Sequence, residues 1–534
     1  MICFDAFCRF GPRPNAHGRE PWTLQHLIEE LDHCSISAAM VASTLQLGYD
    51  AMRENRRLVD ELAPYDWLHP LWNVFPHWTG ETPEPAPFMA LMRRHGVRAV
   101  TLCPKSNGWS LRSRTSRPLL AELEQARVPV VLSQGSESLE ADTIEWLLEE
   151  HPQLPVILRE VGWRHARLII PLVRRYPSLH LAFDHCQIHR GLEWLVEQGC
   201  EDQLIFASHA PTMSAGAHRF TIDYAEIPDA ARRKIASGNL LRLLGDLPEP
   251  APRENRGEDP IMAEARQGKP LSPLVLDIHA HVLDEGLDGG GGVNFMHDGG
   301  PQGIRKLARR MGVDGIGVMS WHGTIACAAA EGNRTVQAAL DSEDDFFWGL
   351  GTFDVIHDSP EAMRASMEAL FSDRRFLGLK PYPSYGIPYD DPRYDVWWQF
   401  GHERKLYCGI HPTKWYETEE FHSICGRFED LTVIAYHCGG SYDVADAAIE
   451  LARKYPNFYA EITLTPVCGG IIDYLVEGCG PQRVLYGSDM PMRDPRQQLG
   501  WVVYSRLPVE QKMAVLGGNT RRILERVRAA QREG

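Results

Sequence analysis

Short apolar runs recur along the whole chain, and each is followed by a longer segment with the apolar spacing of a helix. In the second half the runs include LVLDIHAHV, RFLGLKPY, LYCGIHP, LTVIAYH and RVLYGSD, and in the first half MICFDAF, VRAVTLC, VPVVLSQ and LHLAFDH. Strands that alternate with helices in this way are typical of βαβ units. The pattern therefore predicts an α/β fold built on parallel sheets.

One stretch interrupts this rhythm near the middle of the chain. Residues 246–273 are rich in proline and charge and lack apolar periodicity, which is typical of a linker between domains. The segments on either side, 1–245 and 274–534, each have the length of a (β/α)8 barrel, about 250 residues. We therefore expect two TIM-like barrels in tandem, joined by this linker.

The two halves also resemble each other in sequence. YLVEGCGPQRVLYGSDMP at 474–491 can be laid on WLVEQGCEDQLIFASHAP at 194–211 without a gap, and KYPNFY at 454–459 on RYPSLH at 175–180. A long-period match of this kind indicates an internal duplication.

The strongest local motif is Asp277-Ile-His279-Ala-His281, in the first strand of the second half. Alternate residues of a strand face the same side, so both imidazoles are expected to point into the barrel. Four further polar residues each end a later apolar run and precede a Pro or Gly turn signal. The carboxyl ends of barrel strands share one rim, so all of these groups are expected to converge there, where imidazole and carboxylate suit Zn²⁺ or a similar ion. The four residues are Lys380, His411, His437 and Asp489.

This ordered set resembles the amidohydrolase superfamily, most closely its "amidohydrolase 2" branch, which includes hydrolases and decarboxylases. The resemblance implies that His279, His281 and Asp489 hold a divalent metal, with His411 as a fourth ligand. It also implies that His437 serves as a ligand or as an acid/base group. Zinc is the expected ion, with manganese or iron as alternatives.

Lys380 leaves two alternatives open. In binuclear members of the superfamily a carboxylated lysine after the fourth strand bridges two metals, and in mononuclear members a lysine here binds a substrate anion or packs at the strand end. We predict one metal. Four further residues are weaker candidates for the substrate pocket: Trp321, His322, Glu461 and Arg493.

Three functions fit these residues. The first is hydrolysis of an amide, lactone or ester, because zinc lowers the pKa of bound water to about 7. Asp489 would then transfer the proton, and His437 would polarise the oxygen that becomes anionic. The second is decarboxylation of a small carboxylic acid on the same site, and the third is a non-catalytic binding protein. We expect the first, on a small-molecule or peptide-like substrate.

The first half lacks these groups at the matching positions, so we predict a degenerate, non-catalytic barrel. We expect it to pack on the second barrel within the chain, and the whole chain to be able to form a homo-oligomer. The residues that replace His279, His281, Lys380, His411, His437 and Asp489 are Phe7, Arg9, Thr101, Ser133 (or Gln134), Glu160 and His209.

Composition and charge limit the partners and the cellular location that we expect. The net charge of −16 leaves no basic surplus for binding nucleic acid. No apolar run approaches the ~18 residues of a membrane span, and the first residues do not resemble a secretory signal. The 12 cysteines are scattered without a CxxC pair, which favours reduced thiols and a cytoplasmic location.

Overall fold

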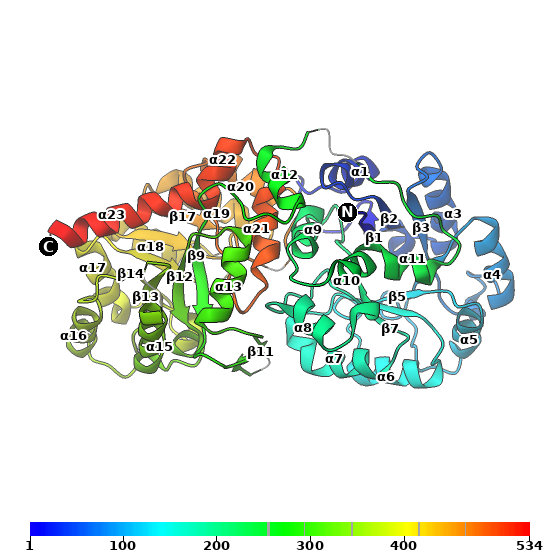
Figure 1. Cartoon of the computed structure of the whole chain (residues 1–534), viewed down its shortest axis with the longest axis horizontal. Coiled ribbons are helices and arrows are strands. Elements are labelled where there is room, and N and C mark those ends of the chain that lie inside the picture. Colours follow the sequence, from blue (N-terminus) through cyan, green and yellow to red (C-terminus); the bar gives the residue numbers. More distant parts are fainter. Residues whose placement is uncertain (254–256, 293, 343–344, 415–416, 465, 534) are drawn as a thin grey trace. The chain divides into compact units, whose positions relative to one another are not determined.

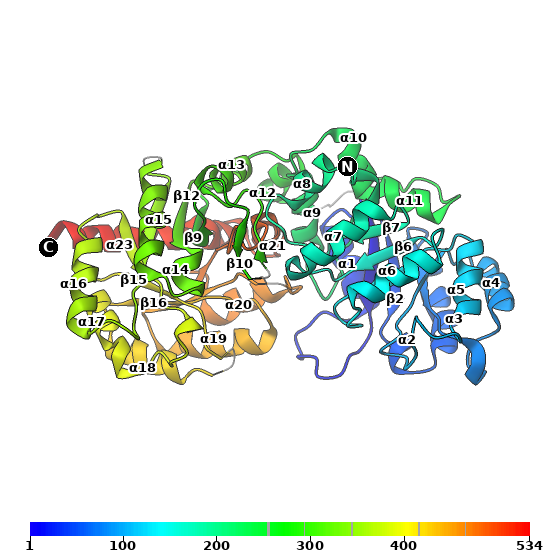
Figure 2. The same ribbon diagram turned by 90° about the horizontal axis from the view of Figure 1, so that it is seen from below.

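The computed structural model describes residues 1–533 except 254–256, 293, 343–344, 415–416 and 465. The described chain forms two compact units, residues 1–187 with 191–258 and residues 188–190 with 259–534. Each unit holds one parallel sheet of eight strands in sequential order, wrapped by helices, as α4 to α7 show for the first sheet in Figure 1 and α16 to α19 for the second in Figure 2. The predicted pair of (β/α)8 barrels is confirmed.

The first sheet closes on itself. The amide of Ala6 donates to the carbonyl of Phe206, and that of Arg9 to the carbonyl of Ala210, both at 3.0 Å, which joins the first strand to the eighth. Its strands are β1 (Phe4–Phe10), β2 (Ala38–Ser43), β3 (Leu68–Asn73), β4 (Ala99–Thr101), β5 (Val130–Ser133), β6 (Val156–Arg159), β7 (Leu179–Ala182) and β8 (Leu204–Ile205). The main helices around it are α1 (Leu24–His33), α3 (Ala51–Leu62), α4 (Pro85–Arg94), α5 (Arg117–Gln125), α6 (Ala141–Glu150), α7 (Ala166–Arg175), α8 (Gly191–Glu197), α9 (Ala215–Asp223) and α11 (Asn239–Leu244).

The second sheet closes in the same way, because the amides of Ser488 and Asp489 both donate to the carbonyl of His279. Its strands are β9 (Leu276–Val282), β12 (Gly315–Ser320), β13 (Phe347–Gly351), β14 (Phe376–Leu379), β15 (Tyr407–Ile410), β16 (Thr432–Ala435), β17 (Phe458–Glu461) and β18 (Val484–Leu485). The main helices are α13 (Pro301–Met311), α14 (Trp321–Ile325), α15 (Ala329–Ser342), α16 (Pro360–Leu370), α17 (Asp395–Glu403), α18 (Glu419–Arg427), α19 (Tyr442–Lys454), α20 (Ile471–Cys479), α21 (Pro495–Val503) and α23 (Asn519–Glu533).

The duplication extends to single hydrogen bonds. In each barrel a buried aspartate of the first strand, Asp5 or Asp277, accepts from the amide and hydroxyl of a serine after the eighth strand, Ser208 or Ser488. Each barrel also has a π-helical turn directly before its last helix, at 234–238 before α11 and at 514–518 before α23. Two copies with the same polar contacts at the same places descend from one barrel.

The predicted linker contains a short helix, α12 (Pro260–Arg266), which the sequence pattern did not suggest. The side chain of Asp259 caps it by accepting from the amide of Met262 at 2.9 Å, and Pro260 occupies the first turn. Its Ile261 and Met262 are buried. The helix belongs to the second unit, so the described boundary between the units lies near residue 258.

None of the helices in the described part of the chain is both long and apolar enough to span a membrane. All twelve cysteines are free thiols.

Candidate metal centre

The two histidines of β9 lie inside the second barrel. His279 and His281 are both almost completely buried, and their ring centroids are 6.0 Å apart. They project from the same side of the strand because one residue separates them. The structure thus brings together the pair that the HxH motif predicts.

The other predicted residues stand directly after later strands, at the same end of the barrel. Lys380 follows β14, His411 follows β15, His437 lies two residues after β16, and Asp489 lies four residues after β18. His437 and Asp489 have left-handed backbones, with φ of +69° and +58°. Such a conformation is uncommon for residues other than glycine and often marks a functional site, because surrounding contacts must hold it.

Three of these side chains form a ligand-like cluster. One ligand atom from each of His279, His437 and Asp489 lies within 4.8 Å of the other two. The Oδ1 atom of Asp489 is 3.5 Å from Nε2 of His279 and 3.2 Å from Nε2 of His281. The ring of His411 lies 4.8 Å from that of His437, centroid to centroid. All five predicted metal or acid/base residues therefore meet at one place, and their roles as ligands stay predictions.

Hydrogen bonds behind the cluster orient three of its imidazoles. The Nδ1 atom of His279 is 3.0 Å from Oε2 of Glu461, that of His437 is 2.7 Å from the carbonyl of Thr463, and that of His411 is 3.0 Å from the carbonyl of Pro412. A carbonyl only accepts, so Nδ1 of His437 and of His411 carries the proton and Nε2 the lone pair. Metal-binding histidines are commonly held by such outer contacts.

Glu461 is one of these supports. It is fully buried, and Oε2 also accepts from the amide of His437 at 3.2 Å. Its other oxygen accepts from the amide of Thr463 at 2.7 Å and from the hydroxyl of the same residue. In the structure its carboxylate contacts His279, His437 and Thr463, and its predicted role in the substrate pocket stays a prediction.

Burial sets the protonation of the cluster. Desolvation lowers the pKa of His279, His281 and His437, and it lowers the pKa of His411 to about 4. Burial alone would raise the pKa of Asp489, but the neighbouring His279 and His281 and the guanidinium of Arg493 outweigh it and hold that pKa well below its usual value. Neutral imidazoles beside an ionised carboxylate are the forms that bind a metal, so the donor set fits a divalent ion.

Lys380 is a buried amine without a polar partner. Its Nζ atom makes no hydrogen bond within the described part of the chain and lies 4.0 Å above the ring of Tyr436. Burial lowers the pKa of Lys380 to about 7. An amine in this state is a suitable partner for an anion that enters the barrel.

Two of the remaining predicted pocket residues, Arg493 and Trp321, contact the cluster. Arg493 donates from Nε to Oδ2 of Asp489 at 3.1 Å, so it orients that carboxylate. Trp321 packs edge-on against His281, with ring centroids 4.9 Å apart. His322, the next residue, places Nδ1 3.2 Å from the hydroxyl of Ser320.

One functional neighbour was not predicted from the sequence. Tyr436 stacks on His279 with ring centroids 3.7 Å apart and an interplanar angle of 16°, and its hydroxyl donates to the carbonyl of Ile278 at 3.1 Å. The only signal in the sequence is its position directly before His437, and this does not reveal the direction of the ring.

The matching rim of the first barrel is built differently. The amide of Glu160 donates to Asp184 at 3.0 Å, just as the amide of His437 donates to Glu461, which supports the alignment of Glu160 with His437. However, Asp184 and Glu160 both bind the guanidinium of Arg159, whose Cζ atom lies 3.7 Å from the ring centre of Phe7. The guanidinium of Arg159 therefore pairs with both carboxylates of this rim, which leaves them bound to a side chain of the protein itself.

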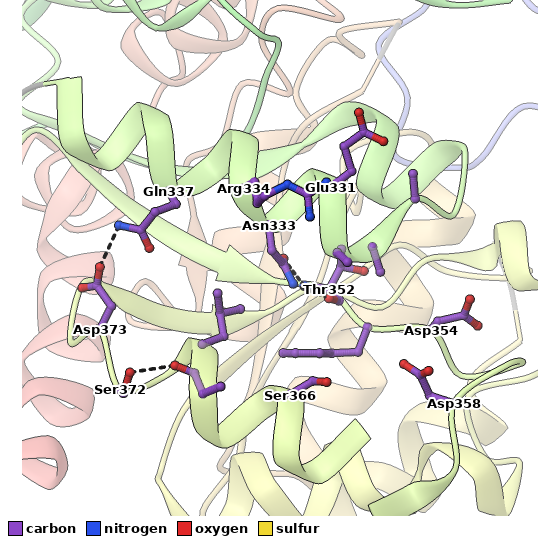
Figure 3. A pocket seen from close by; sticks show the side chains of 16 residues that line it. Glu331, Asn333, Arg334, Gln337, Thr352, Asp354, Asp358, Ser366, Ser372 and Asp373 are labelled. Carbon is purple, nitrogen blue, oxygen red and sulfur yellow. Dashed lines mark hydrogen bonds between the residues drawn. The ribbon is translucent and has the colours of Figure 1, made fainter. Parts of the chain in front are cut away.

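A cavity of about 820 Å³ lies elsewhere in the second unit, between α15 and α16 (Figure 3). Its described lining includes Arg334, Asp358 and Thr352, and it contains none of the residues of the candidate centre. We therefore do not assign the chemistry to this cavity.

Two closed parallel barrels, one with a histidine and carboxylate cluster at the carboxyl ends of its strands, define a (β/α)8 protein with a candidate metal site. The family model "Amidohydrolase" matches residues 40–245 and 276–526, so the chain belongs to the amidohydrolase family. Both barrels match separately, which agrees with the duplication. A comparison with curated proteins finds no match.

Solved structures with similar folds each cover about one barrel. The 5-carboxyvanillate decarboxylase of Sphingomonas paucimobilis is 16% identical, with a TM-score of 0.37 over 48% of this chain and 99% of that chain. The 4-oxalomesaconate hydratase of Rhodopseudomonas palustris is 17% identical, with a TM-score of 0.37 over 48% and 98%. A dihydroxybenzoic acid decarboxylase of Polaromonas sp. JS666, with bound manganese, is 14% identical, with a TM-score of 0.38 over 47% and 97%.

Proposed function

We propose that the second barrel is a metal-dependent hydrolase that cleaves an amide, lactone or ester. The observation that carries the proposal is the convergence of His279, His437 and Asp489 within 4.8 Å, with His281 beside them. Zinc is the proposed ion, and manganese and iron are the alternatives. The free thiols suit a reducing compartment, so we propose a cytoplasmic location.

The residues of the candidate centre have different proposed roles. His279, His281, His411 and Asp489 would hold the ion, which supplies a water of lowered pKa and polarises a carbonyl. Asp489 is ionised and fixed by Arg493, so it can accept a proton from that water and return it to the leaving group. His437 donates from Nδ1 to the carbonyl of Thr463, so its Nε2 carries a lone pair; this nitrogen would serve as a further ligand, or would take up a proton and then donate it to the oxygen that becomes anionic.

Decarboxylation of a small carboxylic acid is the second candidate, and Lys380 is the observation that favours it. A buried amine that makes no hydrogen bond to any of the described residues can hold a carboxylate in the barrel. The same ion and the same Asp489 would then serve to deliver a proton to carbon.

Two probes distinguish these reactions. The zinc-loaded or manganese-loaded protein is incubated with para-nitrophenyl acetate in water enriched in oxygen-18, and separately with 2,6-dihydroxybenzoate in deuterated water. Hydrolysis places the heavy oxygen in the acid product, whereas decarboxylation releases CO₂ and places deuterium on carbon. The hydrolase proposal is overturned if only the second reaction occurs and depends on the metal.

Lys380 also tests the number of metals. We expect one ion per chain, because the histidines and Asp489 of the described cluster offer enough ligands for one ion without the amine of Lys380. Lys380→Arg keeps the charge but cannot form a carbamate bridge. Its metal content should therefore equal that of the wild type by elemental analysis. A fall from two ions to one in this variant would instead show that Lys380 bridges a pair of metals, which usually lie about 3.5–4 Å apart.

The first barrel is proposed to be inert and to act by packing. His209→Ala should leave turnover unchanged within about twofold, because changes outside a working site cost little. Glu160→Ala should also spare turnover but lower the melting temperature, since Arg159 loses a partner at 2.8 Å inside the barrel. A metal that is lost from the protein on either substitution would contradict the proposal.

A further inference from the structure

The first unit contains a cavity of about 570 Å³ that the proposed reaction does not use. Its wall is formed by the segments that follow β2, β3 and β4, and these segments supply Tyr49, Trp78 and Trp109 respectively. They leave the sheet at the carboxyl ends of its strands, the end where barrel proteins bind their ligands. A volume of this size is typical of small-molecule sites.

Aromatic rings line this cavity although two of them are largely open to solvent. Tyr49 is 63% exposed and Trp78 is 61% exposed. Trp78 is nevertheless fixed, because its indole nitrogen donates to the carbonyl of Thr115 at 2.8 Å and the ring of His77 packs on it with centroids 4.4 Å apart. An exposed indole that is held in one orientation forms a rigid platform rather than a loose surface side chain.

The charged residues of the lining are all acidic. Asp50 and Glu81 face the cavity, and no lysine, arginine or histidine belongs to its described lining. Asp50 caps α3 through one oxygen, which accepts from the amide of Arg53 at 2.8 Å. The guanidinium carbon of Arg53 lies 5.4 Å from the ring centre of Tyr49, outside the lining, which shows that this ring already faces a cation.

We propose that this cavity, which we call the aromatic pocket, binds a small organic ammonium ion, with methylated ammonium preferred. Ring faces attract cations through their quadrupole, and methyl groups on nitrogen add apolar contact with the indole. The two carboxylates add charge complementarity, whereas a small anion would meet only like charge. The site lies within the first unit, so the inference does not depend on the reaction proposed for the second barrel.

Choline and its neutral isostere 3,3-dimethylbutan-1-ol are the probes, titrated into the full-length protein by calorimetry. Choline should saturate one site per chain, and the neutral alcohol should bind at least about twofold more weakly, the smallest effect expected for a cation–π contact. Equal binding of the two compounds would overturn the proposal, as would choline binding that does not saturate in the tens of millimolar range.

Substitutions locate the site. Trp78→Leu should weaken choline binding at least about twofold, and Glu81→Gln should weaken it while sparing the neutral alcohol. Trp22→Leu is the matched control, because Trp22 is also exposed, at 48%, but lies outside the cavity. Circular dichroism confirms that each variant folds. Choline binding that is lost in Trp22→Leu, or kept in full by folded Trp78→Leu, would show that the aromatic pocket is not the site.

The candidate metal centre provides the second control. The variant His279→Ala/His281→Ala should bind choline with wild-type affinity, since those residues belong to the other unit. Loss of choline binding in that variant would show that choline binds at the candidate metal centre, and it would overturn the proposal.

Discussion

Replacing both His279 and His281 by alanine is expected to remove the bound metal and to reduce turnover more than about 100-fold. Loss of an outer support alone costs about 10–100-fold in metal affinity or activity, and this change removes two ligands themselves. Elemental analysis of the purified protein gives the ion content per chain. Turnover of the ester or acid probe is measured beside it, with added zinc or manganese.

The matched control is His357→Ala. His357 lies in the same unit, but its side chain is 79% exposed and pairs with Asp354, away from the cluster residues. It should keep both the metal and the activity. If the double variant contains as much metal as the wild type, the ion is held elsewhere, and both the ligand assignment and the proposed reaction would have to be abandoned.

The fold can be predicted well from the sequence because each apolar run forms one strand of a barrel and the segment after it forms a helix around that barrel. Residues at the ends of those runs are placed on one rim by topology alone, which is why His411, His437 and Asp489 could be grouped from their positions after three separate strands. The duplication also followed from sequence, since matched segments such as 194–211 and 474–491 carry the same strand end and turn.

What the sequence does not determine is the direction in which a side chain at the rim points. Glu461 and Tyr436 both lie at strand ends, yet one supports His279 from behind and the other stacks on it. Their directions depend on how the strands of the closed barrel are offset from one another. Such an offset is a property of the closed barrel, so no local pattern reveals it.

The first barrel shows a second limit of the same kind. The replacement of ligands by Phe7, Arg9 and Glu160 is visible in the sequence, but the ion pair that fills the rim is not. Arg159 was outside the aligned positions, and it binds Asp184 through two nitrogens at 3.1 and 2.7 Å. Asp184 does not align with Glu461, but it accepts from the amide of Glu160 as Glu461 accepts from the amide of His437, and in the first barrel a guanidinium neutralises that carboxylate.

The second large effect is expected at Asp489, whose carboxylate has two distinct tasks. Its Oδ1 atom faces His279 and His281, while Oδ2 accepts from Arg493. Asparagine has the same shape, and its oxygen can still face a cation or accept a hydrogen bond, but an amide does not take up a proton near neutral pH. The substitution therefore separates holding the ion from moving the proton.

Asp489→Asn, saturated with metal, should lose about 10²–10⁴-fold in turnover, the usual contribution of a general acid–base group. Elemental analysis must accompany the assay, so that the loss is counted only on protein that contains the ion. Asp395→Asn is the control, because Asp395 lies in the same unit in an exposed pair with Arg427 and should not affect turnover. Wild-type turnover in metal-replete Asp489→Asn would exclude this carboxylate from proton transfer. His437, which donates to the carbonyl of Thr463, would then be the next group to test for proton transfer.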